Sequence, residues 1–171
     1  MKIYNFSAGP TKLPRKVISK ACEAVKYYSP INSSILEISH RSSEFNDILE
    51  NLNENFKKLF NLPSNFKILL LQGGATYQNT LISKNIPKGK KLGCMINGYW
   101  GLKSFKDFES EYQNVISYKF SKDILNNIQN FNFTDSDYLH ITSNETIDGI
   151  QIRNFNNINH PKLVVDMSSD I

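Results

Sequence analysis

Cysteine is scarce in this 171-residue sequence, and its placement argues against several classes of protein. Cys22 and Cys94 are the only two, and neither belongs to a Cys-x-x-Cys pair or lies at metal-ligand spacing from a histidine. The sequence therefore predicts neither a disulfide scaffold nor a metal site. Two reduced thiols in a cytoplasmic protein are the simplest interpretation.

Long hydrophobic runs are also missing. The N-terminal residues MKIYNFSAGP lack the apolar stretch of a secretory signal, and no segment is long enough to span a bilayer. The net charge of +4 comes from scattered lysines, with one short group at residues 88–91, so a nucleic-acid footprint is not indicated. We expect a cytoplasmic protein without membrane or nucleic-acid partners, and an anionic small substrate fits the charge equally well.

What the sequence does contain is an alternation of helical and strand-like patterns. Helical periodicity covers residues 14–28 and 43–60, and further helices are expected from about Thr76 and after Tyr99. Short apolar runs, which predict strands, occupy residues 66–71, 92–96, 115–119, 138–142 and 163–165. This order predicts an α/β domain with a mostly parallel sheet and flanking helices. No repeat, low-complexity linker or domain boundary is visible.

A glycine pair lies between the run at 66–71 and the helix that follows. Gly73 and Gly74 allow a tight turn, and the free N–H groups at the start of the helix, together with the Thr76 hydroxyl, can point at an anion. The spacing matches neither the Walker A motif nor the dinucleotide fingerprint. A phosphate site and an ordinary strand-to-helix turn are both compatible with it.

Other polar or aromatic residues also follow apolar runs. Because ligands of parallel sheets bind at the carboxyl ends of the strands, Trp100, Thr146 and Asp166 are expected to converge on one rim. Asp166 could orient a cationic ring nitrogen or a metal, or it could cap a helix or join a structural ion pair. Trp100 could stack on a ring or fill the core, and Thr146 could bond an oxygen or lie in a turn. His40 and Arg41 could bind a carboxylate or phosphate, although their spacing alone favours an ordinary surface pair.

Six motifs together resemble the phosphoserine aminotransferases from end to end of the chain, and in order. They are NFSAGP at 5–10, EISHR at 37–41, QGGATYQ at 72–78, GYW at 98–100, SNETIDG at 143–149 and VDMSSD at 165–170. The resemblance implies the large domain of a fold-type I enzyme that depends on pyridoxal phosphate and works as a homodimer. Residues 1–171 would be its N-terminal segment and the first part of that domain.

The resemblance also implies roles for individual residues. Gly74, Ala75 and Thr76 would hold the cofactor phosphate, and Asp166 would keep the ring nitrogen protonated as the catalytic partner of the ring. Trp100 would stack on the ring, and Thr146 would bond its oxygen. Ser7, His40 and Arg41 would bind the acidic end of the substrate.

The implied reaction moves an amino group between glutamate and 3-phosphohydroxypyruvate, with 2-oxoglutarate as the other product, in serine biosynthesis. A phosphorylated four-carbon analogue on the route to pyridoxine is a second candidate substrate. The family's Schiff-base lysine is expected beyond Ile171, since no lysine follows Asp166. The chain alone is therefore expected to be inactive and to lack the rest of the large domain and the small domain.

Two alternatives remain open at this stage. The chain could be a noncatalytic remnant or interaction module that keeps weak cofactor binding. It could also be a different fold-type I enzyme, such as an alanine–glyoxylate-type aminotransferase or a desulfurase. The combination of His40-Arg41 with Asn144-Glu145-Thr146 argues against the second alternative.

Overall fold

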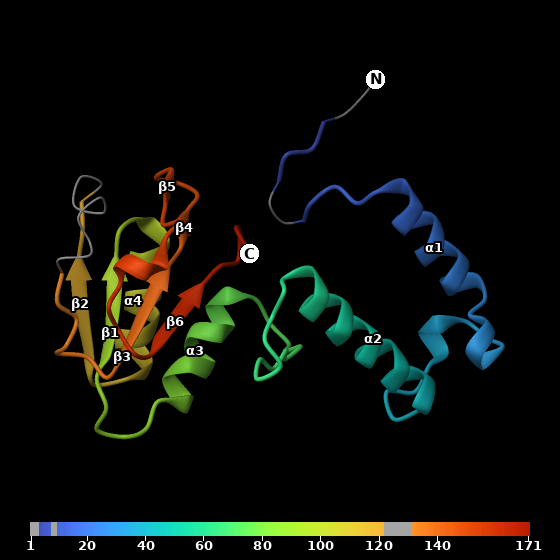
Figure 1. The fold of residues 1–171 in the computed structure, drawn as a ribbon, viewed down its shortest axis with the longest axis horizontal. Coiled ribbons are helices and arrows are strands. Elements are labelled where there is room, and N and C mark those ends of the chain that lie inside the picture. The colour runs from blue at the N-terminus through green and yellow to red at the C-terminus, as the bar shows by residue number, and fades with distance from the viewer. Residues whose placement is uncertain (1–3, 8–9, 122–130) are drawn as a thin grey trace. The chain divides into compact units, whose positions relative to one another are not determined.

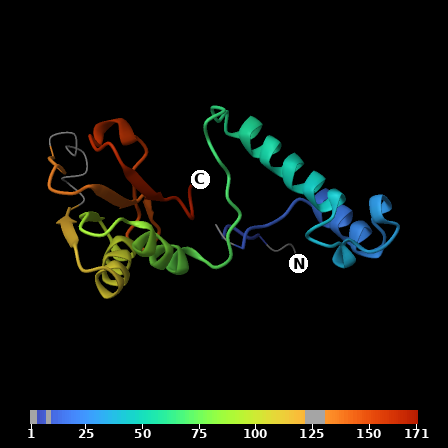
Figure 2. The same ribbon diagram turned by 90° about the horizontal axis from the view of Figure 1, so that it is seen from below.

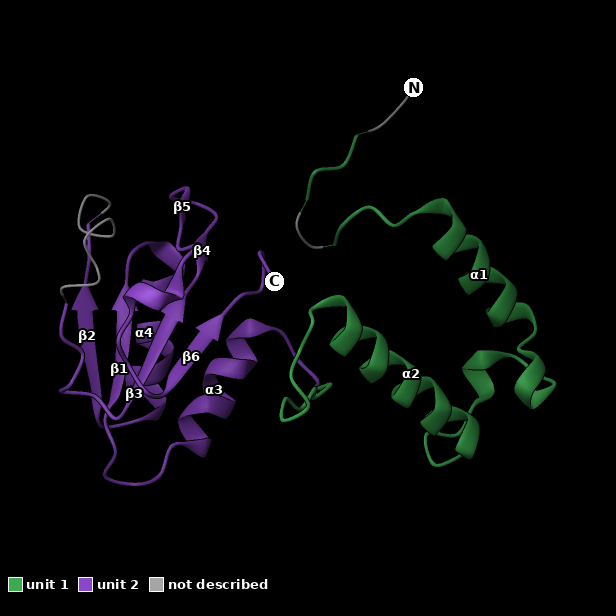
Figure 3. Ribbon diagram, viewed as in Figure 1, with its two compact units in different colours: residues 1–71 green, residues 72–171 purple. Residues whose placement is uncertain are grey.

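The computed structural model describes residues 4–7, 10–121 and 131–171. The chain divides into two compact units, residues 1–71 (unit 1) and residues 72–171 (unit 2), which are coloured separately in Figure 3. The sequence shows no linker composition at this boundary. Each unit is described by itself below.

The described residues of unit 1 form two helices and two short helical turns. They are α1 (Arg15–Lys26), η1 (Ser29–Ile31), η2 (Ile35–Glu37) and α2 (Ser43–Leu59). Ser42 caps α2, because its hydroxyl oxygen accepts a hydrogen bond from the backbone N–H of Phe45 at 3.2 Å. Both helices are amphipathic, yet no described residue of unit 1 is buried.

The prediction of a strand at residues 66–71 is wrong. The segment is not a strand, and the side chains of Leu69, Leu70 and Leu71 are all more than half exposed. A strand forms only when a neighbour takes its backbone hydrogen bonds, and none of the pairings among the described residues involves this segment. Apolar composition alone therefore did not determine its conformation.

Unit 2 is built on a parallel sheet in the order β2-β1-β3-β6, visible in Figure 1 as four arrows pointing the same way. The strands are β1 (Leu92–Ile96), β2 (Val115–Lys119), β3 (Tyr138–Thr142) and β6 (Leu163–Asp166), and the helices are α3 (Ala75–Asn85) and α4 (Tyr99–Glu111). A short hairpin of β4 (Asn144–Glu145) and β5 (Ile150–Gln151) follows β3, and η4 (Phe155–Asn157) precedes β6. The predicted α/β architecture is confirmed for these elements.

Side chains alternate between two hydrophobic clusters on the two faces of the sheet. One cluster includes Met95, Leu139 and Ile141, with Phe155 of η4 packed against it. The other includes Leu92, Cys94 and Phe108 of α4, with Ile82 of α3 packed against it. Figure 2 shows α3 and α4 on one side of the sheet and η4 on the other. Even-numbered residues of β3 consequently face the two helices.

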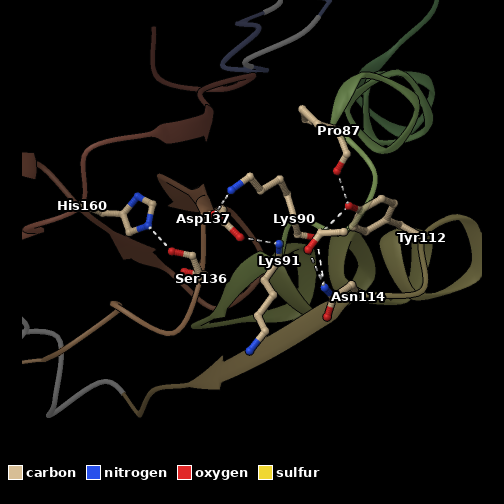
Figure 4. A network of polar contacts seen from close by, with 9 residues as sticks. Pro87, Lys90, Lys91, Tyr112, Asn114, Ser136, Asp137 and His160 are labelled. Atoms are coloured by element: carbon tan, nitrogen blue, oxygen red, sulfur yellow. Dashed lines mark hydrogen bonds and ion pairs between the residues drawn. The ribbon is translucent and has the colours of Figure 1, made fainter.

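A polar network joins the loops at the amino ends of the strands (Figure 4). Asp137 accepts hydrogen bonds from the Lys91 backbone N–H at 2.8 Å and from Lys90 Nζ at 2.9 Å, and these contacts lower the pKa of Asp137. The Tyr112 hydroxyl donates to the Lys90 carbonyl oxygen at 2.7 Å. The network occupies the edge of the sheet opposite to the carboxyl ends of the strands.

None of the helices in the described residues is sufficiently long and apolar to cross a membrane. Within the same residues, no three side chains of histidine, cysteine, aspartate or glutamate gather as a metal site.

Candidate functional site

A cavity of about 200 Å³ lies at the carboxyl ends of β3 and β6. Four residues singled out in the sequence line it together: Ala75, Trp100, Thr146 and Asp166. They come from the starts of α3 and α4, the segment after β3 and the end of β6. The remaining lining residues carry hydroxyl or amide groups, and they are Thr142, Asn144, Ser168 and Ser169.

Asp166 ends β6 and is the register partner of Thr142 on β3. Its Oδ1 accepts two hydrogen bonds from Ser168, one from the backbone N–H at 3.0 Å and one from the hydroxyl at 2.6 Å. No helix begins at Asp166, and none of the ion pairs found in the described residues includes it. Its carboxylate is thus oriented by a local turn and lines the cavity.

Trp100 is the second residue of α4, and its side chain is 37% exposed, so it does not fill the core. The indole Nε1–H donates to Oγ1 of Thr146 at 2.9 Å. The ring also makes an edge contact with Tyr99, with centroids 5.0 Å apart and planes at 88°. Because Thr146 accepts from the indole, its own hydroxyl proton remains able to serve a second partner.

The start of α4 is capped by two carboxylates that the sequence analysis did not assign. Glu145 is fully buried and accepts from the backbone N–H groups of Trp100 at 2.6 Å and Gly101 at 2.7 Å. Asp148 accepts from the backbone N–H of Tyr99 at 2.7 Å. Burial raises the pKa of Glu145, although the two backbone N–H groups act in the opposite direction.

The start of α3 is open by comparison. Gly73 has a φ of +89°, which favours glycine, and Gly74 precedes the helix without a side-chain cap. The first turn of α3 contains no acidic residue, and Thr76 is exposed there. Ala75, the first residue of α3, lines the cavity, whereas Gly74 and Thr76 are not among its lining residues.

A second cavity of about 450 Å³ shares Ala75, Asp166 and Ser168 with the first and is also lined by His140. His140 is buried against Phe108, with ring centroids 4.8 Å apart, and burial lowers its pKa to about 4. Its Nδ1 lies 3.8 Å from the sulfur of Cys94, whose pKa burial raises to about 12. At neutral pH both groups are uncharged, so this pair provides neither a cationic acid nor a thiolate.

The side-chain hydroxyl of Thr142 indicates that the cavity suits a polar ligand. Its Oγ1 is buried and has no hydrogen-bond partner among the described residues, and the residue lines the cavity. A buried hydroxyl without a partner is costly, and a polar ligand would relieve that cost. A flat indole, a carboxylate, hydroxyl groups and an open helix start suit a ligand that combines an aromatic ring with an anion.

Ser7, His40 and Arg41 belong to unit 1 and are exposed. The Ser7 backbone N–H donates to Oδ1 of Asn5 at 2.8 Å, and the Arg41 backbone N–H donates to the Ser39 hydroxyl oxygen at 3.3 Å. Their part in binding a substrate stays a prediction.

Comparisons with known proteins identify the family to which the chain is similar. Residues 3–171 match the family described as Aminotransferase class-V. A phosphoserine aminotransferase of Streptococcus thermophilus is 34% identical over 180 residues, which covers 100% of this chain and 50% of the relative.

Two solved structures are similar over nearly the whole chain. Phosphoserine aminotransferase from Bacillus circulans subsp. alkalophilus matches with a TM-score of 0.86 and 32% identity, covering 99% of this chain and 48% of that one. The pyridoxal phosphate-bound enzyme from Trichomonas vaginalis matches with a TM-score of 0.82 and 27% identity, covering 99% of this chain and 52% of that one. The resemblance and the fold predicted from the sequence are thereby confirmed, and the chain spans about half the length of these relatives.

Proposed function

The chain belongs to the class-V aminotransferase family, and on that premise we propose that its cavity binds pyridoxal phosphate for amino-group transfer. The observation that carries the proposal is the meeting of Ala75, Trp100, Thr146 and Asp166 around one cavity. Each of the four comes from a different part of the sequence, and each has a chemical use for one part of this cofactor.

Bound pyridoxal phosphate supplies a ring that accepts the electrons released when a substrate loses its α-proton. The Asp166 carboxylate would hold the proton on the ring nitrogen, since an adjacent negative charge favours the protonated form. Trp100 would cover one face of the ring, and the free hydroxyl proton of Thr146 would bind the ring oxygen. The open first turn of α3, with Gly74, Ala75 and Thr76, would bind the phosphate.

We propose glutamate and 3-phosphohydroxypyruvate as the substrates, with phosphoserine and 2-oxoglutarate as the products. Support comes from the curated relatives named phosphoserine aminotransferase and from the His40-Arg41 pair, whose donors suit an anionic substrate. The phosphorylated four-carbon analogue of the pyridoxine route, the homodimer and the cytoplasmic location belong to the same proposal. No lysine follows Asp166 in the 171 residues, so turnover is proposed for a form of the protein that supplies one.

Binding can be tested with the 171-residue chain, because Trp100 is its only tryptophan and reports on the cavity alone. The probe is pyridoxamine phosphate, which lacks the aldehyde and therefore does not condense with surface lysines. We expect saturable quenching of Trp100 fluorescence in wild type, much weaker binding in Asp166→Asn, and no change in Asp135→Asn, the exposed control. Quenching that does not saturate, or that is equal in all three proteins, would contradict the proposed cavity.

Turnover is tested separately, in a form that carries the additional lysine. Formation of phosphoserine from glutamate and 3-phosphohydroxypyruvate is expected, and pyruvate or glyoxylate should be poor amino acceptors. A preference for glyoxylate would favour the alanine–glyoxylate type of enzyme. Cofactor binding without turnover of any acceptor would favour the noncatalytic alternative.

A further inference from the structure

Glu145 is a fully buried carboxylate for which the proposed chemistry has no use. Its two oxygens accept from consecutive backbone N–H groups of α4, Trp100 at 2.6 Å and Gly101 at 2.7 Å. None of the ion pairs among the described residues gives it a cation. A buried charge held only by backbone N–H groups is costly, so stability alone is a poor reason for its presence.

The backbone of α4 lies directly against this carboxylate. A Cβ atom on Gly98 would come within 2.6 Å of Glu145 and of Asp148, and a Cβ atom on Gly101 would come within 2.8 Å of the Met95 carbonyl oxygen. Real side chains do not reach such distances, so glycine at these positions allows the close approach. The contact fixes the first turn of α4 against the segment that follows β3.

The same short segment also holds the side chain of Trp100. Glu145 binds the Trp100 backbone, its neighbour Thr146 binds the indole nitrogen at 2.9 Å, and Asp148 binds the preceding amide of Tyr99 at 2.7 Å. The backbone and the ring of Trp100 are therefore tied to the consecutive residues Glu145 and Thr146, and the residue before it is tied to Asp148. A rotation of the ring would have to break the bond to Thr146 or displace the first turn of α4.

We propose that Glu145 is a positioning residue, which sets the plane of the Trp100 ring at the cavity by holding the first turn of α4. Its effect on the ligand rests on the proposed function, whereas its effect on Trp100 does not. A second consequence is that the carboxylates occupy the N–H groups of α4, which leaves the start of α3 for the phosphate group of the ligand.

The test compares Glu145→Gln with Glu109→Gln, an exposed glutamate on the same helix, under conditions where far-ultraviolet circular dichroism shows both proteins folded. In Glu145→Gln one backbone N–H would face an amide NH₂ group instead of an oxygen. We expect a changed near-ultraviolet signal of Trp100 without ligand and about tenfold weaker binding of pyridoxamine phosphate. Glu109→Gln should match wild type in both measurements.

An unchanged Trp100 signal in folded Glu145→Gln would overturn the positioning role. If that variant does not fold, the wild-type protein decides, because protonation of Glu145 should alter the Trp100 signal within the pH range where the fold persists. Asp148, Asp166 and the uncharged Cys94 are the groups that interact with Glu145 in that titration. A near-ultraviolet signal of Trp100 that does not change over this pH range would also overturn the positioning role of Glu145.

Absence of pyridoxamine phosphate binding by wild type would defeat the proposed function while leaving the ligand-free comparison to judge Glu145. Binding by wild type together with an unchanged Glu145→Gln signal and affinity would defeat the positioning role alone. The two failures are therefore distinguishable.

Discussion

The indole nitrogen of Trp100 donates a hydrogen bond to the hydroxyl oxygen of Thr146 across 2.9 Å. The bond joins the start of α4 to the segment after β3, and both residues line the same cavity. The indole ring of Trp100 and the hydroxyl group of Thr146 thus constrain each other.

Thr146→Val should weaken ligand binding, although the valine side chain has nearly the same shape as threonine. The substitution removes the acceptor of the indole N–H and the donor for a ring oxygen, and each lost hydrogen bond costs about 1 kcal/mol. We expect pyridoxamine phosphate to bind about 5- to 30-fold more weakly, measured by Trp100 fluorescence. Thr134→Val, at an exposed threonine, is the control, and equal affinities in the two variants would show that Thr146 makes no contact with the ligand.

Asp166→Ala should reduce turnover far more than Trp100→Phe. Only the first change removes the charge proposed to hold the ring nitrogen protonated, and loss of such a preorganised group costs about 100-fold or more. Replacing the indole by a smaller aromatic ring keeps most of the stacking, so about tenfold is expected. Steady-state kinetics in the form that turns over would measure both, and equal losses would reverse this ranking of roles.

Gly98→Ala should destabilise the protein. The new Cβ atom would lie 2.6 Å from atoms of both Glu145 and Asp148, and relief of such crowding costs about 1–3 kcal/mol. Gly74→Ala is the matched control, because a Cβ atom there meets nothing within 4 Å. We expect denaturant unfolding to show a clear loss of free energy for Gly98→Ala and a smaller one for Gly74→Ala. Similar losses would mean that the first turn of α4 can shift away from the carboxylates.

The raised pKa of Glu145 makes a signed prediction about pH. A group whose pKa is higher in the folded than in the unfolded state binds its proton more tightly when folded, so its contribution to stability is present below the ordinary glutamate value of 4.5 and is lost as pH rises through the folded value. The difference in unfolding free energy between wild type and Glu145→Gln should therefore shift against wild type as pH rises from 4.5. Urea unfolding at several pH values measures it, and a constant difference would contradict the raised pKa.

The two thiols should differ sharply in reactivity. Cys22 is exposed, whereas Cys94 is buried and its pKa is raised to about 12, so Cys94 carries almost no thiolate at pH 8. A thiol reagent such as dithionitrobenzoate should label one cysteine in the native chain and two after denaturation. Cys22→Ser should abolish the native reaction. Rapid labelling of Cys94 in that variant would show that the cluster around Phe108 opens readily.

The strands that were predicted correctly from the sequence are those that pair with a neighbouring strand among the described residues. The runs at 92–96, 115–119 and 138–142 match β1, β2 and β3, because each is short, apolar and followed by turn or helix signals. The run at 66–71 has the same composition but remains exposed and unpaired. Strand formation depends on a neighbour, which composition does not reveal.

Part of the candidate site could be predicted from the sequence, because its residues follow predicted strands. Ala75, Trp100, Thr146 and Asp166 stand out because each follows an apolar run. The topology of a parallel sheet brings the last three together, since they follow or end β1, β3 and β6. Glu145 and Thr142 were missed, since burial of a carboxylate or a hydroxyl follows from tertiary packing alone. A usable signal did exist for Thr142, which occupies the last position of β3 and shares strand parity with His140.

The alternation of side chains along β3 places aliphatic residues on one face and polar residues on the other. Along β3, Leu139 and Ile141 pack into one cluster while His140 and Thr142 face the helices and the cavities. A shift of the strand by one residue in register would exchange the two sets, sending aliphatic side chains toward the cavity and Thr142 toward the opposite cluster. The cavities therefore acquire their polar lining only when β3 pairs in the correct register. Substitutions at Leu139 and Ile141 on the opposite face could change the stability of the protein without altering the residues that line the cavities.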